Sequence, residues 1–222
     1  MSGKITLADV KHHPRVETYL KYGHEHLGEM GFTEHGFRHA TLVSTIAHQI
    51  MQRLDYSERE AELAAVAGYL HDIGNVVSRK DHGGTAAIMA MQLLEQLGMP
   101  YEEIAVIAGA IGNHEEEYGV AVNPIAAALI LADKSDVHRS RVRNRDLATF
   151  DIHDRVNYAV THSFVRVESK PRQITLELTI DTSVSSIMDY FEIFLTRMVM
   201  CRRAAALLQA DFAIVINGTK LL

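Results

Sequence analysis

A His-Asp pair stands at the end of an apolar run in the segment GYLHDIGNVV, residues 68–77. The residues before the pair are apolar at helical spacing, and Gly74 is suited to end that helix. A buried imidazole or carboxylate without a partner costs on the order of several kcal/mol. The fold must therefore bring partners for His71 and Asp72 to the end of this helix.

The chain up to about residue 164 carries the pattern of a helical bundle. Ser57 with Glu60 forms a capping-box pattern, Gly98 closes one apolar run, and Asn123-Pro124 opens another. The predicted helices span residues 37–54, 57–71, 85–97, 100–114, 123–133 and, with a weaker pattern, 151–162.

The pattern changes after residue 164. The runs FVRVES and ITLELTID alternate apolar and polar residues around the turn KPRQ, which predicts a β-hairpin. A long apolar helix over residues 185–210 and a strand-like run, FAIVINGTKLL, follow. We therefore expect a mainly α fold with two parts: a helical domain at 1–164 and a small α+β appendage at 165–222, made of the hairpin, the long helix and a final strand.

Several ionisable residues fall near the ends or on the apolar faces of the predicted helices. They are His39, His71, Asp72, His82, His114 and Asp133. A divalent metal is the usual way to satisfy such residues in a bundle core, and imidazole with carboxylate accepts Zn, Fe, Mn, Co or Ni. Because the chain turns at a helix end, His71 can bind one ion while the Asp72 carboxylate bridges two.

Composition narrows the classes of function. The net charge of −6 favours neither a nucleic-acid polymer nor an anionic membrane as a partner, although a metal still permits phosphate binding. The single cysteine, Cys201, cannot form an internal disulfide and is expected in the core of the long helix. No signal-peptide pattern and no 18-residue apolar run is found, so we expect a soluble cytoplasmic protein.

Three short motifs resemble the H…HD…D signature of the HD-domain superfamily. They are FRHA at 37–40, LHDIGN at 70–75 and LADKSD at 131–136. The resemblance covers roughly residues 30–140. It implies an all-α bundle and, for most members, a metal-dependent phosphohydrolase. It also implies that the primary metal ligands are His39, His71, Asp72 and Asp133.

Two further histidines make the sequence similar to HD proteins that hold two metals. His82 in KDHGG and His114 in GNHEEE stand between the HD pair and the last aspartate, as in those branches. The chain departs from the cyclic-dinucleotide phosphodiesterase branch, because NHEEEYGVAV lacks a GYP-type motif and the second adjacent histidine. It also carries Asn75 where many hydrolases of the family have Lys. Possible replacements for that cation are Lys134, Arg79 and Lys80.

The predicted activity is hydrolysis of a phosphate ester of a nucleotide or another small phosphorylated metabolite. Two divalent ions (Fe, Mn, Zn, Co or Mg) about 3.5–4 Å apart clamp a phosphoryl group and activate a water. Asp72 would orient the nucleophile, and Lys134 with the basic run at 138–143 would hold phosphate. Two alternatives stay open: a di-iron oxygenase resembling inositol oxygenase, and a non-catalytic ligand-sensing domain. A homodimer through the appendage is a further possibility.

Some residues have competing interpretations. His82 also fits an exposed Gly-rich loop, and His114 a cation at a helix end. Residues 115–117 fit a solvated acidic turn, and the arginines at 139–145 fit a solvated face. Asp136 is either a partner of the ligands or a surface charge. No role is predicted for His12, His13, His24, His26, His35, His48, His153 and His162.

Overall fold

The computed structural model describes residues 4–221. The helices are α1 (Leu7–Lys11), α2 (Pro14–Glu29), α3 (Phe37–Arg53), α4 (Glu58–Leu70), α5 (His82–Leu97), α6 (Tyr101–Gly112), α7 (Pro124–Lys134), α8 (Ile152–Ala159) and α9 (Ile187–Leu207). Short 3-10 turns η1 (Ile73–Val76), η2 (Arg139–Arg141) and η3 (Leu147–Thr149) connect some of them. The expected helices are thus present, most of them with ends within a few residues of the prediction.

A four-stranded sheet accompanies the helices. Its strands are β1 (Val160–Ser169), β2 (Arg172–Ile180), β3 (Asp211–Ile216) and β4 (Thr219–Lys220), in that spatial order. The pairs β1–β2 and β3–β4 are antiparallel, whereas β2 and β3 are parallel and are joined through α9. A purely helical description is therefore wrong, because the alternating runs after residue 159 pair with one another.

The end of the chain differs from the single strand expected from FAIVINGTKLL. Asn217 and Gly218 both have positive φ, 50° and 79°, so the chain reverses there and β4 returns beside β3. An Asn-Gly pair is a strong signal for such a two-residue hairpin turn. The run therefore forms two short strands.

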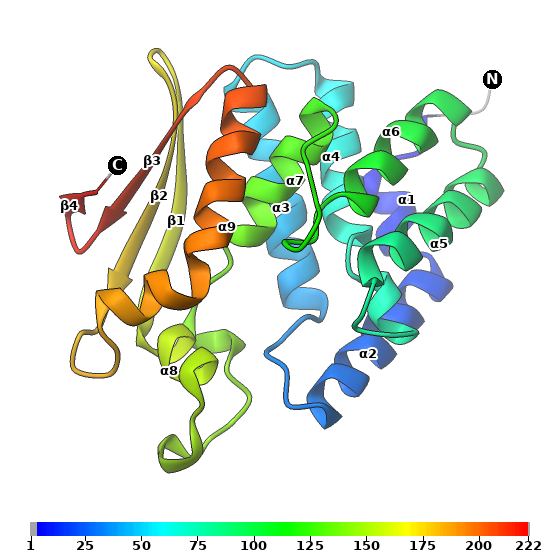
Figure 1. Cartoon of the computed structure of the whole chain (residues 1–222). Coiled ribbons are helices and arrows are strands. Elements are labelled where there is room, and N and C mark those ends of the chain that lie inside the picture. The colour runs from blue at the N-terminus through cyan, green and yellow to red at the C-terminus, as the bar shows by residue number, and fades with distance from the viewer. Residues whose placement is uncertain (1–3, 222) are drawn as a thin grey trace.

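The elements are arranged in layers, as Figure 1 shows: the sheet lies on one side, α9 and α7 lie beside it, and α5 and α6 lie on the far side. Helix α9 packs against both α7 and β3. Buried residues from the helices and the sheet belong to one hydrophobic cluster, which includes Leu129 of α7, Cys201 of α9 and Ile214 of β3. The division of the chain at residue 164 stays a prediction.

Helix α5 begins earlier than predicted, at His82 rather than Thr85. Asp81 before it adopts a left-handed conformation with φ 55°, which turns the chain into the helix. The Glu115 carboxylate accepts a 2.6 Å hydrogen bond from the Gly83 N–H, one of the free donors of the first turn. The Gly-rich segment is consequently helical, and His82 is buried.

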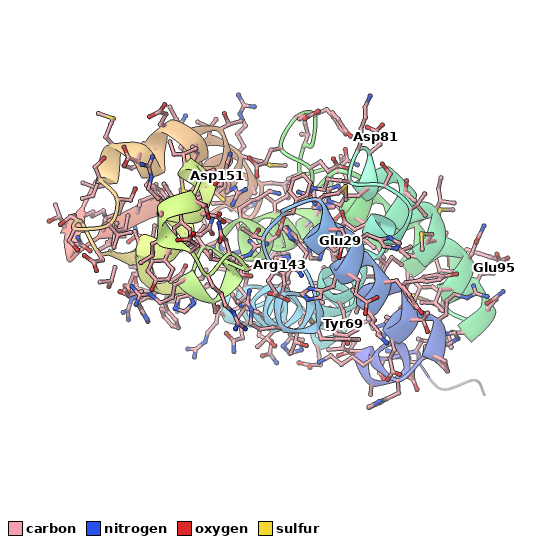
Figure 2. The ribbon with its side chains drawn as sticks, turned by 90° about the horizontal axis from the view of Figure 1, so that it is seen from below. Glu29, Tyr69, Asp81, Glu95, Arg143 and Asp151 are labelled. Carbon is pink, nitrogen blue, oxygen red and sulfur yellow. The ribbon has the colours of Figure 1, made fainter. Side chains whose placement is uncertain are left out.

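Loop residues tie the helical layers together. Arg143, in the loop between α7 and α8, donates to His24 Nδ1 at 2.7 Å and to the His24 carbonyl at 2.8 Å. Seen from below, Arg143 lies between α2 and α8 (Figure 2). Within residues 4–221, every helix is too short or too polar to cross a membrane.

Candidate metal centre

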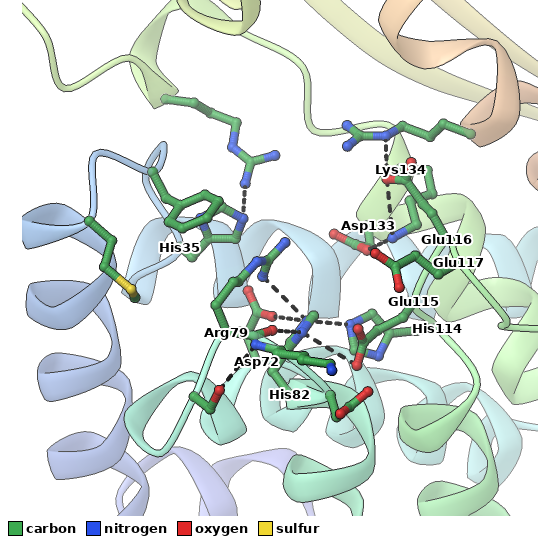
Figure 3. Close-up of a pocket in the computed structure, with 17 residues that line it drawn as sticks. His35, Asp72, Arg79, His82, His114, Glu115, Glu116, Glu117, Asp133 and Lys134 are labelled. Atoms are coloured by element: carbon green, nitrogen blue, oxygen red, sulfur yellow. Dashed lines mark hydrogen bonds and ion pairs between the residues drawn. The ribbon is translucent and has the colours of Figure 1, made fainter.

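One cavity of about 700 Å³ is lined by four of the predicted ligands, Asp72, His82, His114 and Asp133 (Figure 3). The other two, His39 and His71, are buried beside it, with Nε2 atoms 3.3–3.7 Å from the carboxylates of Asp72 and Asp133. Each of the six comes from the end of a helix that points into this region: the start of α3, the ends of α4, α6 and α7, and the start of α5. The four histidines follow one another with ring centroids about 5 Å apart. The row runs His39, His71, His114, His82, at 5.1, 5.0 and 5.0 Å.

Three of these imidazoles have a fixed tautomer. The Nδ1 atom lies 2.8 Å from the Gly68 carbonyl in His71, 3.0 Å from the Arg79 carbonyl in His82, and 2.6 Å from the Ile111 carbonyl in His114. A carbonyl oxygen only accepts, so each Nδ1 carries a proton and donates it. The Nε2 lone pair of each neutral ring is therefore directed into the site.

The ring orientation of His39 is fixed by a carboxylate instead of a carbonyl. Its Nδ1 lies 2.6 Å from Asp136 Oδ2, and both side chains are buried. Asp136 in turn accepts from both terminal nitrogens of Arg38, at 3.3 and 2.8 Å. Asp136 is thus a partner of a predicted ligand and not a surface charge.

The inward nitrogens meet in pairs that need a cation. The Nε2 atoms of His39 and His71 are 3.2 Å apart, and those of His82 and His114 are also 3.2 Å apart. Two rings that carry a proton on Nδ1 alone cannot hydrogen-bond to each other through two Nε2 lone pairs, so a second proton or another cation must lie beside each pair. A divalent ion near each pair resolves this conflict, so the residues present fit metal binding.

Asp72 lies between the two pairs of rings. Its Oδ2 is 3.6 Å from His39 Nε2 and 3.5 Å from His71 Nε2, whereas its Oδ1 is 3.2 Å from His82 Nε2. The buried Oδ2 atom has no hydrogen-bond partner among the described residues. The Asn75 amide donates to Oδ1 at 2.9 Å and fixes the carboxylate. This placement suits a bridging ligand.

The pKa values show how the site behaves without a cation. Burial lowers the pKa of His71, and burial together with the neighbouring His71 holds the pKa of His114 well below its usual range. For His39, burial and Arg141 act to lower the pKa, but hydrogen bonds to Asp133 and Asp136 outweigh them and raise it to about 9. The raised pKa favours the imidazolium form of His39, whose Nε2 lies 3.3 Å from Asp133 Oδ1.

Asp133 completes the donor set at the end of α7. Its Oδ1 lies 3.3 Å from His39 Nε2 and 3.7 Å from His71 Nε2, while its Oδ2 accepts from Lys134 Nζ at 2.7 Å. Burial acts to raise the pKa of Asp133, but Lys134 and the two histidines hold it well below the usual value. The carboxylate is therefore ionised and available to a metal.

All six predicted ligands are brought together. Within the described residues, three groups offer donor atoms that lie within 4.8 Å of one another. The groups are His39–His71–Asp72, His71–His114–Asp133 and Asp72–His82–His114. Asp72 belongs to two of the groups, and so do His71 and His114. The clusters can hold metal, and the number of ions stays a prediction.

Two arginines of the basic run at 138–143, Arg141 and Arg143, are engaged by partners within the protein. Buried Arg141 donates to the carbonyls of Glu34 and Asp136 and to His35 Nε2, which occupies its guanidinium. Arg143 bonds to His24 of α2. These two arginines therefore hold the loop against the bundle, and their tertiary partners explain why sequence pattern alone left both interpretations open.

Three pocket residues were missed by the sequence analysis or given another interpretation. His35 lines the cavity, with Nδ1 on the Thr33 carbonyl at 2.8 Å and Nε2 on Arg141 at 2.9 Å. Glu115 lies 3.4 Å from His82 Nδ1 and caps α5, so it is not simply solvated. Arg197 of α9 also lines the cavity. Nothing in the sequence pattern marks these residues, because their partners are far away along the chain.

The chain matches a known family over more than half of its length. Residues 36–180 match the family described as "HD domain". The chain is 29% identical over 204 residues to the uncharacterized protein MJ1020 of Methanocaldococcus jannaschii, over 79% of this chain and 76% of that protein. It also resembles the crystal structure of a "predicted HD superfamily hydrolase" from an uncultured Thermotogales bacterium, at 21% identity and a TM-score of 0.42, covering 60% of this chain and 75% of the other. Since the family match spans more than half of the chain and includes the His39, His71-Asp72 and Asp133 motifs, the chain belongs to the HD-domain family.

Proposed function

We propose that the chain is a metal-dependent phosphohydrolase that cleaves a phosphate ester of a nucleotide or another small phosphorylated metabolite. The observation that carries the proposal is the meeting of four Nε2 atoms with the carboxylates of Asp72 and Asp133, beside a cavity of about 700 Å³ that both carboxylates line. A cavity of this size has room for a small organic phosphate beside the donor atoms.

The donor groups suggest two neighbouring ions. His39, His71 and Asp72 would hold one, and His82, His114 and Asp72 the other, with Asp133 beside the first. When bound, two divalent ions supply an activated water at neutral pH and positive charge against the transferring phosphoryl group. Asn75 fixes the orientation of the Asp72 carboxylate between them.

Two cations of the cavity would contact the reacting phosphoryl group. Arg79 Nη1 lies 3.3 Å from Asn75 Oδ1 and 3.4 Å from His82 Nε2, and no carboxylate pairs with it within residues 4–221. Its guanidinium is thus available to an oxyanion at the metal centre. Lys134 uses one N–H on Asp133 and has two more for substrate oxygens. In this proposal Arg79 replaces the lysine that is absent at Asn75.

The oxygenase alternative has one specific observation in its favour. The residue at position 75 is not a cation, and its amide is engaged by Asp72 rather than directed to a phosphate. Iron bound by the same ligands would then activate O₂ instead of water. Oxygen consumption by the iron-loaded protein in the presence of small polyols or their phosphates separates this reaction from hydrolysis.

The test is release of inorganic phosphate from a panel of small phosphate monoesters, and cleavage of small diesters, by protein loaded in turn with Mn, Zn, Co, Mg or Fe. We expect turnover with at least one metal. The turnover rate of the variant Asp72→Asn should be more than about 100-fold below that of the native chain. This loss exceeds the one typical of residues outside the ligand set. The exposed Asp211→Asn serves as the control and should keep full activity. Absence of both phosphate release from monoesters and cleavage of diesters, with every metal, would contradict the proposal.

A further inference from the structure

We propose that α9 completes the substrate site and that Arg197 binds a second anionic group of the substrate, separate from the phosphoryl group at the metal centre. This inference rests on the proposed function and specifies its substrate class: small phosphates that carry a carboxylate or another phosphate. Arg197 lies beyond residues 36–180, the part of the chain that matches the HD family, so the shared signature does not account for it.

The guanidinium of Arg197 is held in place before any ligand arrives. Its Nε donates to Glu116 Oε1 at 2.7 Å, and its Cζ lies 4.1 Å from the centre of the Phe194 ring. Within residues 4–221, the bond to Glu116 is the one hydrogen bond that this guanidinium makes. Its two terminal nitrogens are therefore available to an anion, and the fixed plane lowers the entropy cost of binding it.

The side chains of Lys134 and Glu116 lie between Arg197 and the predicted ligand Asp133. Lys134 Nζ lies 2.7 Å from Asp133 Oδ2 and 3.8 Å from Glu116 Oε1, which in turn accepts from Arg197 (Figure 3). Glu116 Oε1 is thus shared by Lys134 and Arg197, and within residues 4–221 no carboxylate pairs with the terminal nitrogens of Arg197. A group bound by Arg197 must belong to a different part of the substrate from the group bound at Asp133.

A second cavity of about 310 Å³ extends the site at this place. Arg79 and Arg197 line both cavities, which puts them where the two meet. Within residues 4–221, neither carboxylate that lines the second cavity forms an ion pair with Arg197. Asp151 accepts from the Asp154 N–H at 2.7 Å at the start of α8, and Asp154 lies 3.4 Å from the Asn144 amide.

The experiment measures binding, not turnover, so that it can fail independently of the proposed function. The probes are ω-phosphonocarboxylates of increasing chain length and the ω-hydroxyalkylphosphonates that match them. Their C–P bonds are not esters and stay intact during titration calorimetry with the metal-loaded full chain. Since a charge-assisted hydrogen bond contributes about 1.5–3 kcal/mol, we expect at least one carboxylate member to bind about 10-fold or more tightly than its hydroxyl match.

The variants assign that preference to a residue. Arg197→Met should bring the preference close to unity, Arg197→Lys should retain part of it, and Arg203→Met, an exposed arginine on the same helix, should retain all of it. Equal binding of both probe series by the native chain, or a preference that survives Arg197→Met, overturns the inference. If the chain prefers the carboxylate probes but hydrolyses no phosphate ester, the anion site at Arg197 is supported and the proposed hydrolase activity is rejected.

Discussion

The orientation of the ligand histidine His39 depends on Asp136, a residue that the sequence alone did not assign to the site. Asp136 accepts from His39 Nδ1 and from Arg38, and Arg141 Nη1 donates to the Asp136 carbonyl at 2.6 Å. Through its carboxylate and its carbonyl, Asp136 therefore links α3, the end of α7 and the following loop. It also fixes which nitrogen of His39 is available to a metal.

Asp136→Asn tests this role. The amide keeps the shape but removes the charge that holds the His39 N–H, and it leaves Arg38 without its buried partner. We expect metal affinity to fall about 10–100-fold, as measured by competition with a chelating dye. Asp211→Asn, an exposed carboxylate at the start of β3, should leave metal affinity unchanged. Native affinity in Asp136→Asn would show that Asp136 does not position the ligand.

At the scale of the elements, the site depends on how closely η1 approaches α5. A Cβ on Gly74 would lie 2.2 Å from the His82 carbonyl oxygen and 2.7 Å from the Ala86 nitrogen, both backbone atoms. Only glycine permits this contact, which places His82 next to Asp72. The glycine of the HDIG motif thus serves the geometry of the second ligand group as well as the end of α4.

Gly74→Ala should therefore push α5 away from η1. We expect a clear drop in melting temperature and weaker metal binding at the group that contains His82. The matched control is Gly84→Ala in the first turn of α5, where an added Cβ meets nothing within 4 Å. That change should be neutral or stabilise the helix by up to about 1 kcal/mol. Equal melting temperatures for the two variants would contradict this account of the contact.

The helices and the ligand residues could be predicted because both leave a local signal. Apolar spacing and caps such as Ser57 with Glu60 mark the elements, and the HD motifs mark the ligands. The other residues of the cavity could not be predicted, because Arg197 and His35 reach it only through tertiary packing. The early start of α5 was missed because Gly83 and Gly84 have low helix propensity, which the Glu115 cap and burial override.

At the scale of the whole molecule, the sheet and α9 support the helix that carries Asp133. Helix α9 packs on α7, and its buried residues share one cluster with those of the bundle. Yet every predicted metal ligand precedes residue 165. The C-terminal part is therefore expected to matter for stability and substrate binding more than for the ligand set.

Deletion of the chain from residue 165 onward tests this expectation. Removing the chain that covers α7 exposes part of the apolar core, including Leu131, so we expect aggregation or a large loss of solubility. Metal binding by any soluble fraction should be retained in part. The measurements are size-exclusion chromatography and metal content. A soluble truncated chain that binds no metal would contradict the prediction.

The central claim is that the cavity holds two metal ions, and the most direct test is the metal content of the full chain. We would measure it by elemental analysis after loading and removal of free metal, together with Asp72→Ala and His82→Ala. The account predicts two ions per native chain and about one ion per chain for His82→Ala. It predicts loss of both ions for Asp72→Ala, because Asp72 belongs to the group with His39 and to the group with His82. One ion in the native chain, unchanged in His82→Ala, would contradict the binuclear site. No bound ion at all would contradict the metal centre itself.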